Sequence, residues 1–146
     1  MEKKDFQVTE EDKRDIVKRT YKFALRVFYI VNKLPKNVLT FRVIDQLLGS
    51  GTAMGSNTEE ASAGFSRSDF TYKMSIASKE ARETNYWFRL LRDSGLVKDE
   101  TLLKEIIDAI DESNQIKRIL TSVVKTSQTK VKKLNDHSKL KKPSNL

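Results

Sequence analysis

The sequence contains no cysteine and a single histidine, His137, and these two scarcities remove most familiar catalytic sites. Without cysteine there is no disulfide framework, no thiolate nucleophile and no sulfur-ligated metal site. A serine nucleophile needs a neighbouring base, and one histidine outside the expected core offers none. We therefore expect a protein that is not an enzyme, with no catalytic residue, cofactor or bound metal.

Long apolar runs are also missing. The longest, such as Val27–Val31, fall far short of the roughly 20 residues that a membrane-spanning helix needs. The N-terminus has no apolar stretch after a basic region, as a signal peptide would. We expect a cytoplasmic protein without a membrane partner. Its 146 residues are typical of one domain that buries a core without covalent links.

Proline and glycine are scarce, with two and five residues, so few positions interrupt a helix. An alternation of period two never persists, which argues against strands. Two segments, 41–65 and 70–91, repeat apolar or small residues at alternating spacings of four and three, as in helices that pack nearly parallel. The positions are Phe41, Ile44, Leu48, Gly51, Gly55, Thr58, Ser62 and Phe65, then Phe70, Met74, Ala77, Ala81, Thr84, Phe88 and Leu91.

Four helices follow from these patterns and from capping residues. We expect them at about residues 10–33, 37–65, 68–93 and from 99 onward. Thr9 with Asp12 resembles a capping box for the first, Ser66 or Ser68 caps the third, and Gly95 suits the position after its end. The short connections predict an all-α, antiparallel up-down-up-down four-helix bundle. It covers residues 9–128, between a flexible N-terminus (1–8) and a basic, disordered tail (129–146).

The first helix has an unusually broad apolar stripe, which includes Phe28 and Val31. A stripe of this width exceeds what one seam of a bundle needs. Two explanations suit it equally: the stripe could form a second contact, such as a subunit interface, or the helix could be central in the bundle and covered on several sides.

Positive charge is concentrated at the C-terminus. The formal net charge is +8, and residues 125–146 hold seven lysines and one aspartate. Such a tail is typical of proteins with a polyanionic partner, although it equally suits a solvated tail. A row of cations at a spacing of four residues also lies along the first helix. It could contact successive phosphates of a nucleic acid, or it could simply be a solvated helix surface. The candidate nucleic-acid-binding residues are Arg14, Lys18, Arg19, Lys22, Arg26, Lys33, Lys36, Lys130, Lys132 and Lys133.

Acidic residues on the second and third helices raise the question of a carboxylate-bridged metal site. Such sites use Glu-x-x-His pairs, and neither Glu60 nor Glu80 is followed by histidine. An ion-pair network between the two helices, or ordinary surface charge, explains them better. The candidate network is Glu59, Glu60, Lys73, Lys79, Glu80 and Glu83. The stretch 49–57, GSGTAMGSN, lacks the spacing and the lysine of a phosphate-binding loop, so we read it as helix with a small-residue face.

The segment QLLGSGTAMGSNTEEASAGFSRSDFTYKMSIASKEARETNYWFRLL, residues 46–91, resembles the four-helix-bundle proteins encoded in intervening sequences of bacterial 23S ribosomal RNA genes. FALRVFYIVNKLP, residues 23–35, is a weaker match. Gly49 and Ser56 are mild departures, because a basic residue and alanine are common there in the family.

This resemblance implies a ring-shaped homopentamer. It also implies a fold similar to the accessory variability determinant of diversity-generating retroelements, a basic protein that binds nucleic acid and a reverse transcriptase. Two functions remain open on this basis. The first is a non-enzymatic, oligomeric accessory protein that binds RNA or DNA and assists a reverse transcriptase. The second is a homo-oligomeric scaffold for protein interactions without nucleic-acid activity.

Overall fold

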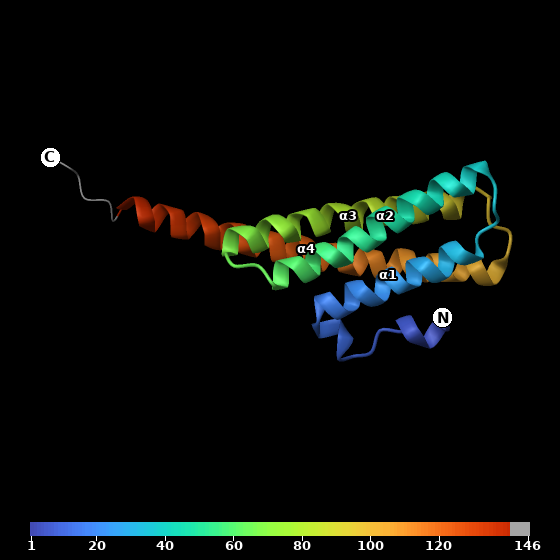
Figure 1. Ribbon diagram of the computed structural model, residues 1–146, viewed down its shortest axis with the longest axis horizontal. Coiled ribbons are helices and arrows are strands. Elements are labelled where there is room, and N and C mark those ends of the chain that lie inside the picture. Colours follow the sequence, from blue (N-terminus) through green and yellow to red (C-terminus); the bar gives the residue numbers. More distant parts are fainter. Residues whose placement is uncertain (141–146) are drawn as a thin grey trace.

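The computed structural model describes residues 1–140, and within this range it contains four long helices and no strand. Figure 1 shows the four helices side by side, with the last extending well beyond the others. The predicted all-α class is confirmed. The elements are η1 (Lys3–Phe6) and η2 (Asp12–Arg14), which are short 3-10 helices, then α1 (Ile16–Lys33), α2 (Val38–Ser62), α3 (Arg67–Asp93) and α4 (Glu100–Leu140).

Helix α1 begins later than the sequence predicts. Its N-cap residue is Asp15, whose carboxylate accepts hydrogen bonds from the backbone nitrogens of Val17 and Lys18 at 3.0 and 3.2 Å. The predicted pair of Thr9 and Asp12 does form, with distances of 2.8 and 3.2 Å between backbone nitrogen and side-chain oxygen. It closes the turn before η2, because a reciprocal cap of this kind satisfies the free backbone groups of any short turn. The predicted start near residue 10 is therefore wrong.

The other helix ends lie close to their predicted positions. Asn37 caps α2, Ser66 caps α3, and the Asp99 carboxylate accepts a hydrogen bond of 2.7 Å from the backbone nitrogen of Leu102 in α4. Gly95 follows α3 with a φ angle of 72°, the left-handed conformation that glycine adopts without strain.

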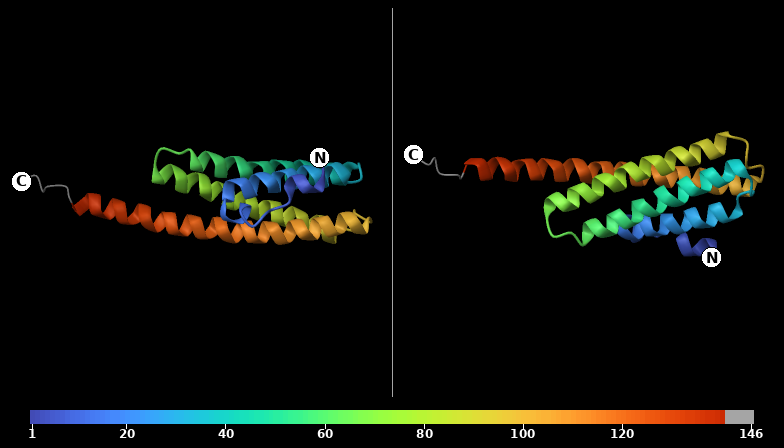
Figure 2. Two further views of the ribbon diagram at one scale, coloured as in Figure 1. Left: turned by 90° about the horizontal axis from the view of Figure 1, so that it is seen from below. Right: turned by 45° about the horizontal axis from the view of Figure 1, so that its top comes forward.

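The core lies between all four helices. Helices α1 and α3 each pack on α2 and α4, so α1 and α3 are diagonal neighbours across the core, and the views in Figure 2 agree. Phe23 of α1 and Phe88 of α3 meet edge to face, with ring centroids 6.2 Å apart and planes at 86°. The central buried side chains are Phe23, Val27, Ile30, Leu47, Met54, Met74, Phe88, Leu91, Ile106, Ile116 and Leu120.

The seam predicted on α3 is confirmed from Met74 to Leu91, whereas the seam on α2 is wrong at both ends. Phe41 is exposed, and Phe65 lies beyond the end of α2 and is fully exposed. A straight helix drifts by about 20° per heptad relative to a strict seven-residue repeat. Over the length of α2 this drift turns Phe41 away from the core, whereas Phe65 is exposed because the helix already ends at Ser62.

Glycines in the middle of α2 let α1 approach its backbone closely. A Cβ atom on Gly51 would lie 2.9 Å from Cγ2 of Val27, and one on Gly55 would lie 3.5 Å from the carbonyl oxygen of Thr20. Val27 and Thr20 are both fully buried. The glycine-rich stretch is therefore a surface for helix packing.

This close approach predicts opposite results for two neighbouring Gly→Ala variants. Alanine is favoured over glycine in a helix by about 1 kcal/mol, and Gly49 has open space around it, so Gly49→Ala is expected to stabilise the protein. In Gly51→Ala the added methyl overpacks Val27, at a cost of about 1–3 kcal/mol. Urea unfolding followed by circular dichroism should give Gly51→Ala a free energy of unfolding about 1–3 kcal/mol lower than that of Gly49→Ala. Equal stabilities would contradict the tight contact between α1 and α2.

The two ends of the chain are more ordered than the sequence predicts. Phe6, within the segment predicted to be flexible, is 1% exposed and packs on Tyr29 with ring centroids 4.9 Å apart. Helix α4 continues to Leu140, so residues 129–140 are helical where a disordered tail is predicted. Neither glycine nor proline interrupts this stretch, and it propagates from a helix already anchored in the core. The rest of the predicted tail, 141–146, lies outside the described residues.

Within residues 1–140, no helix combines the length and the apolar character needed to cross a membrane.

Candidate nucleic-acid interface

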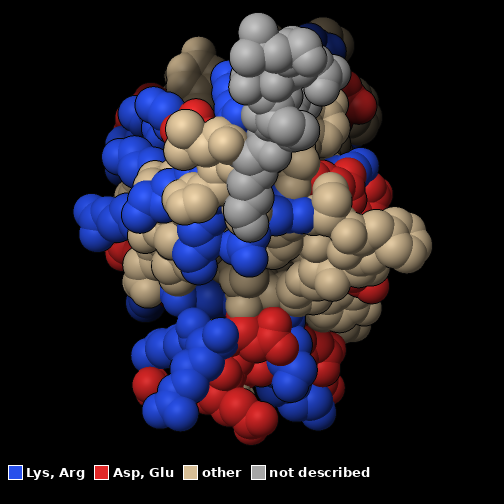
Figure 3. Space-filling view, turned by 90° about the vertical axis from the view of Figure 1, so that its left-hand side faces the viewer, with Lys and Arg blue, Asp and Glu red and all other residues tan. Residues whose placement is uncertain are grey.

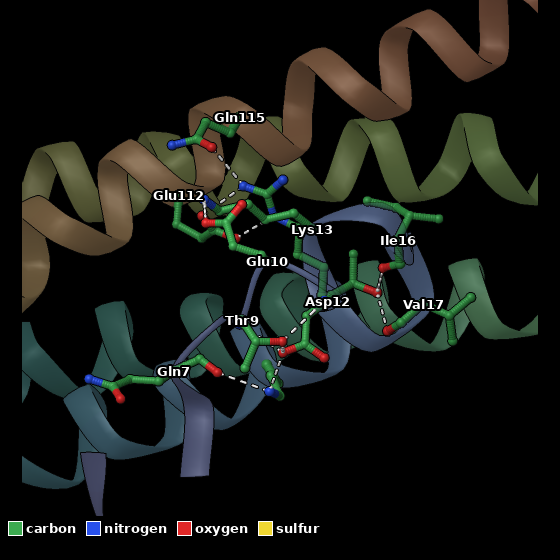
Figure 4. A network of polar contacts seen from close by, with 12 residues as sticks. Gln7, Thr9, Glu10, Asp12, Lys13, Ile16, Val17, Glu112 and Gln115 are labelled. Carbon is green, nitrogen blue, oxygen red and sulfur yellow. Dashed lines mark hydrogen bonds and ion pairs between the residues drawn. The ribbon is translucent and has the colours of Figure 1, made fainter. Parts of the chain in front are cut away.

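The cation row predicted on the first helix separates into residues with different roles. Arg19 faces α4 and is only 4% exposed. Its Nε and Nη2 atoms donate to the carboxylate of Glu112 at 2.6 and 2.9 Å, and Nη2 also donates to Gln115 at 2.7 Å. Figure 4 shows this network beside the N-terminal segment. Arg19 thus links α1 to α4 inside the fold and presents no charge to a ligand.

Lys22 and Arg26 hold the N-terminal segment against α1. The Lys22 ammonium donates to the carbonyl oxygen of Gln7 at 2.9 Å and to Oδ2 of Asp12 at 2.5 Å. This bond, together with those from Thr9, lowers the pKa of the Asp12 carboxyl strongly. The Arg26 guanidinium lies 5.3 Å from the centre of the Phe6 ring. Both cations are therefore engaged by residues that precede α1.

The remaining members of the row are exposed. Lys33 donates to the hydroxyl of Tyr29 at 2.5 Å and lies 3.9 Å from the centre of its ring, and Lys36 donates to the last-turn carbonyl of Val31 at 3.0 Å. Arg14 and Lys18 form no ion pair with any residue from 1 to 140. The row thus keeps two cations whose side chains have neither a hydrogen bond nor an ion pair in this range, Arg14 and Lys18, at the start of α1.

The tail lysines Lys130, Lys132 and Lys133 are exposed on the last turns of α4. Figure 3 looks at the end of the molecule from which α4 projects. Blue Lys and Arg side chains gather on one side and in the middle of this view, whereas red and blue side chains mix in its lower part. Positive charge thus predominates on one part of this end.

A second basic cluster, which the sequence analysis missed, lies between α3 and α4. Arg82, Lys117, Arg118 and Lys125 line a groove of about 380 Å³ together with two hydroxyl side chains. Burial lowers the pKa of Lys117, and the neighbouring positive charges of Arg82, Arg89 and Arg118 lower it further. The combination shows a local excess of positive charge, and none of the residues that line this groove is a carboxylate. One signal in the sequence points to it, the seven-residue spacing of Arg118 and Lys125.

Only one pair of the candidate polar network on α2 and α3 comes together. Lys73 and Glu60 form an ion pair. Glu83 instead accepts a hydrogen bond of 3.4 Å from Nε1 of Trp87, and burial, followed by the charge of Glu83, raises the pKa of Glu80. Glu59 and Lys79 are exposed and join no ion pair among residues 1–140. In the same range, no three His, Cys, Asp or Glu residues are grouped so that they could hold a metal ion.

Comparison with known proteins identifies the family. The family model described as "23S rRNA-intervening sequence protein" matches residues 12–122. The chain belongs to this family. The resemblance seen in residues 46–91, and more weakly in residues 23–35, is therefore confirmed at the level of the family, and the match spans α1, α2, α3 and the first half of α4.

A solved structure supports the same assignment. It is a protein of unknown function from the S23 ribosomal protein family of Bacteroides thetaiotaomicron, with 32% sequence identity and a TM-score of 0.66. The similarity covers 77% of this chain and 97% of that protein. No curated protein matches the chain.

The family match separates the two basic regions of α4. Arg82, Lys117 and Arg118 lie inside the matched range, whereas Lys125 and the tail lysines Lys130, Lys132 and Lys133 lie beyond residue 122. The segment that contains η1 also lies outside the match. The N-terminal segment packed on α1 and the basic end of α4 thus lie outside the matched residues.

Proposed function

We propose that this member of the 23S rRNA-intervening sequence protein family is a non-enzymatic accessory protein that binds nucleic acid through phosphate contacts. In this proposal the four helices form an antiparallel up-down-up-down bundle, and the bundles assemble into a ring-shaped homopentamer. RNA or DNA is the ligand. A reverse transcriptase as protein partner stays a prediction that rests on the resemblance to the retroelement accessory protein.

The distribution of positive charge along α4 is the observation that carries this proposal. Residues 125–140 of this helix hold five lysines and one aspartate, in a chain with a formal net charge of +8. Lys130, Lys132 and Lys133 are exposed on a regular helix. A helix that projects beyond the core carries its cations to a long polyanion without distorting the fold.

Repetition in an oligomer strengthens contacts that are weak in one chain. Each phosphate contact is a modest, screened interaction. When several copies engage one strand, the second and later contacts become intramolecular and the overall affinity rises without any new contact type. Arg14 and Lys18 of each copy add to this sum.

We expect the affinity for nucleic acid to fall steeply with salt and to depend on the tail lysines. Each cation that neutralises a phosphate contributes about 0.7–0.9 to the slope of log K against log salt. A triple variant, Lys130→Gln/Lys132→Gln/Lys133→Gln, should therefore lower the slope by about 2 if all three contact phosphates. Fluorescence anisotropy of a labelled structured RNA and of a single-stranded DNA, titrated at several salt concentrations, measures it.

A control variant with the same loss of charge separates local contacts from net charge. Lys4→Gln/Lys98→Gln/Lys104→Gln removes three exposed lysines far from the tail. It should leave the slope nearly unchanged. An affinity that is indifferent to salt, or no binding at low salt, would overturn the proposal.

One observation favours the second candidate function, a scaffold for protein interactions. The first turns of α2 expose Val38, Leu39 and Phe41, and Leu39, Val43, Leu90 and Leu96 line a largely apolar groove beside them. The broad stripe of α1 does not serve this purpose as a whole, since Val31 is buried in the chain's own core and only Phe28 is exposed. Native mass spectrometry of the protein, combined with the binding assay, distinguishes an oligomer without nucleic-acid affinity from the accessory protein.

A further inference from the structure

Two hollows follow one another along the outer side of the contact between α3 and α4, and together we call them the α3–α4 groove. Hydroxyl side chains form a polar floor where the two helices meet. The hydroxyl of Ser78 lies 3.4 Å from that of Thr121, which also accepts a hydrogen bond of 3.2 Å from Nη2 of Arg82. Further along, the hydroxyls of Thr71 and Ser127 are hydrogen-bonded. These contacts pair the helices through small side chains and leave the longer cationic side chains at the rim.

Cations follow this groove at a regular spacing along α4. Arg118, Lys125, Lys132 and Lys139 are seven residues apart and all exposed, which sets successive side chains about 10.5 Å apart along the helix, each turned by about 20° from the one before. The first two line the hollow of about 380 Å³ with Arg82, and the last two line a hollow of about 600 Å³ with Tyr72. One carboxylate, Asp136, faces the second hollow.

The charges in the groove are not neutralised within the fold. None of the four α4 cations, nor Arg82 or Lys117, forms an ion pair with residues 1–140. Lys117 donates instead to the amide oxygen of Asn114 at 3.0 Å, and Arg89 to that of Asn85 at 3.1 Å. Neutral partners orient these cations and leave their charge available, and the resulting repulsion favours an anion in the groove.

Two exposed tyrosines flank the cations on α3. Tyr86 is 49% exposed and Tyr72 is 63% exposed, and their separation of fourteen residues sets them about 21 Å apart on one side of the helix. Tyr86 follows Arg82 by four residues, so the two side chains are neighbours on the helix surface. The ring of Tyr86 rests against Trp87 at a centroid distance of 5.6 Å and an angle of 78°, which holds it in position.

We propose that the groove between α3 and α4 binds single-stranded nucleic acid, with Arg82, Arg118 and Lys125 on the phosphates and Tyr86 as a platform for a base. This inference rests on the proposed function and adds to it a site for unpaired bases beside the tail lysines. Exposed aromatic rings beside a cationic groove bind unpaired bases by stacking, whatever the base, whereas the bases of a duplex already stack on one another. Lys132, Lys139 and Tyr72 repeat the same combination further along α4.

The test compares an oligothymidylate of about 16 nucleotides, the upper end of the site size of a single-strand binding module, with a duplex of the same length. Fluorescence anisotropy is measured with three variants of the full chain. Arg82→Gln/Arg118→Gln/Lys125→Gln removes the phosphate contacts, and Lys4→Gln/Lys98→Gln/Lys104→Gln removes the same charge elsewhere. Tyr86→Ala removes the stacking platform, whereas Tyr86→Phe keeps an aromatic ring at the same position. Tyr21→Ala is the control, because it removes an exposed tyrosine from α1, away from the groove. Circular dichroism and native mass spectrometry verify that each variant keeps its fold and assembly.

The proposal predicts that the groove triple variant lowers the salt slope for the oligothymidylate by about 2, while the control triple variant does not. It also predicts that Tyr86→Ala weakens oligothymidylate binding about tenfold or more, spares the duplex, and is rescued by phenylalanine. Equal effects of the two triple variants would overturn the groove and leave the proposed function standing. If the groove triple variant loses affinity for the oligothymidylate but Tyr86→Ala does not, the proposal that the groove binds single-stranded nucleic acid would be overturned. No binding by the unaltered protein at low salt would overturn both.

Discussion

Replacing Arg19 with alanine is expected to lower the free energy of unfolding by about 3–5 kcal/mol, because the substitution leaves a mostly buried carboxylate without its partner. The Glu112 side chain is 13% exposed, and Arg19 donates to it with two nitrogens. Water cannot fully replace those donors. The pair joins α1 to α4, so its loss also weakens the docking of α1. Urea unfolding followed by circular dichroism measures the change.

Two controls separate this effect from charge removal in general. Arg14 stands in the same predicted row and is exposed, so Arg14→Ala should change stability by less than about 0.5 kcal/mol. The double variant Arg19→Met/Glu112→Leu replaces both charges with apolar groups and should recover most of the loss. A mild effect of Arg19→Ala on stability, together with weaker nucleic-acid binding by the folded variant, would contradict the structural role and restore Arg19 to the interface.

The sequence predicted the helices well because their periodicity is a direct consequence of burial. Ala77, Ala81 and Phe88 recur at the spacing of one helix face, and all three are fully buried. Capping residues predicted the ends for a similar reason, since Asn37 and Ser66 satisfy backbone groups only a few residues away. Periodicity and capping depend on residues that are close together in the chain, so both can be predicted from a single sequence.

The candidate interface was harder to predict because a cation's role depends on what packs against it. Lys18, Arg19 and Lys22 are close neighbours in the sequence, yet one is exposed, one is paired with α4 and one holds the N-terminal segment. No spacing rule for a single helix distinguishes these outcomes. The partners lie 93 residues away for Arg19 and on a segment that folds back for Lys22.

For the groove between α3 and α4, by contrast, the sequence does indicate part of the site. Arg118, Lys125, Lys132 and Lys139 repeat every seven residues in the sequence, so they share a helix face. The sequence does not indicate that Arg82 and Tyr72 of α3 lie beside that face, because this depends on the register of two helices whose contacts are mostly between small residues.

Replacing Phe88 with alanine should be about as damaging as losing Arg19, with an expected cost of about 3–5 kcal/mol. Phe88 is fully buried and meets Phe23 edge to face across the diagonal of the core. Alanine leaves a cavity that the two helices cannot close, because α2 and α4 hold them apart. Phe65→Ala is the matched control, since this side chain is fully exposed, and it should change stability by less than about 0.5 kcal/mol.

A double-mutant cycle with Phe23→Ala tests whether the two rings act together. An edge-to-face pair contributes about 0.5–1.5 kcal/mol beyond the area that it buries, and the two cavities merge, so the double variant should cost less than the sum of the single variants. Additive costs would contradict a direct contact between α1 and α3. The coupling energy between Phe23 and Phe88 therefore tests whether α1 and α3 lie diagonally across the core. The same arrangement places the α3–α4 groove on the outer surface.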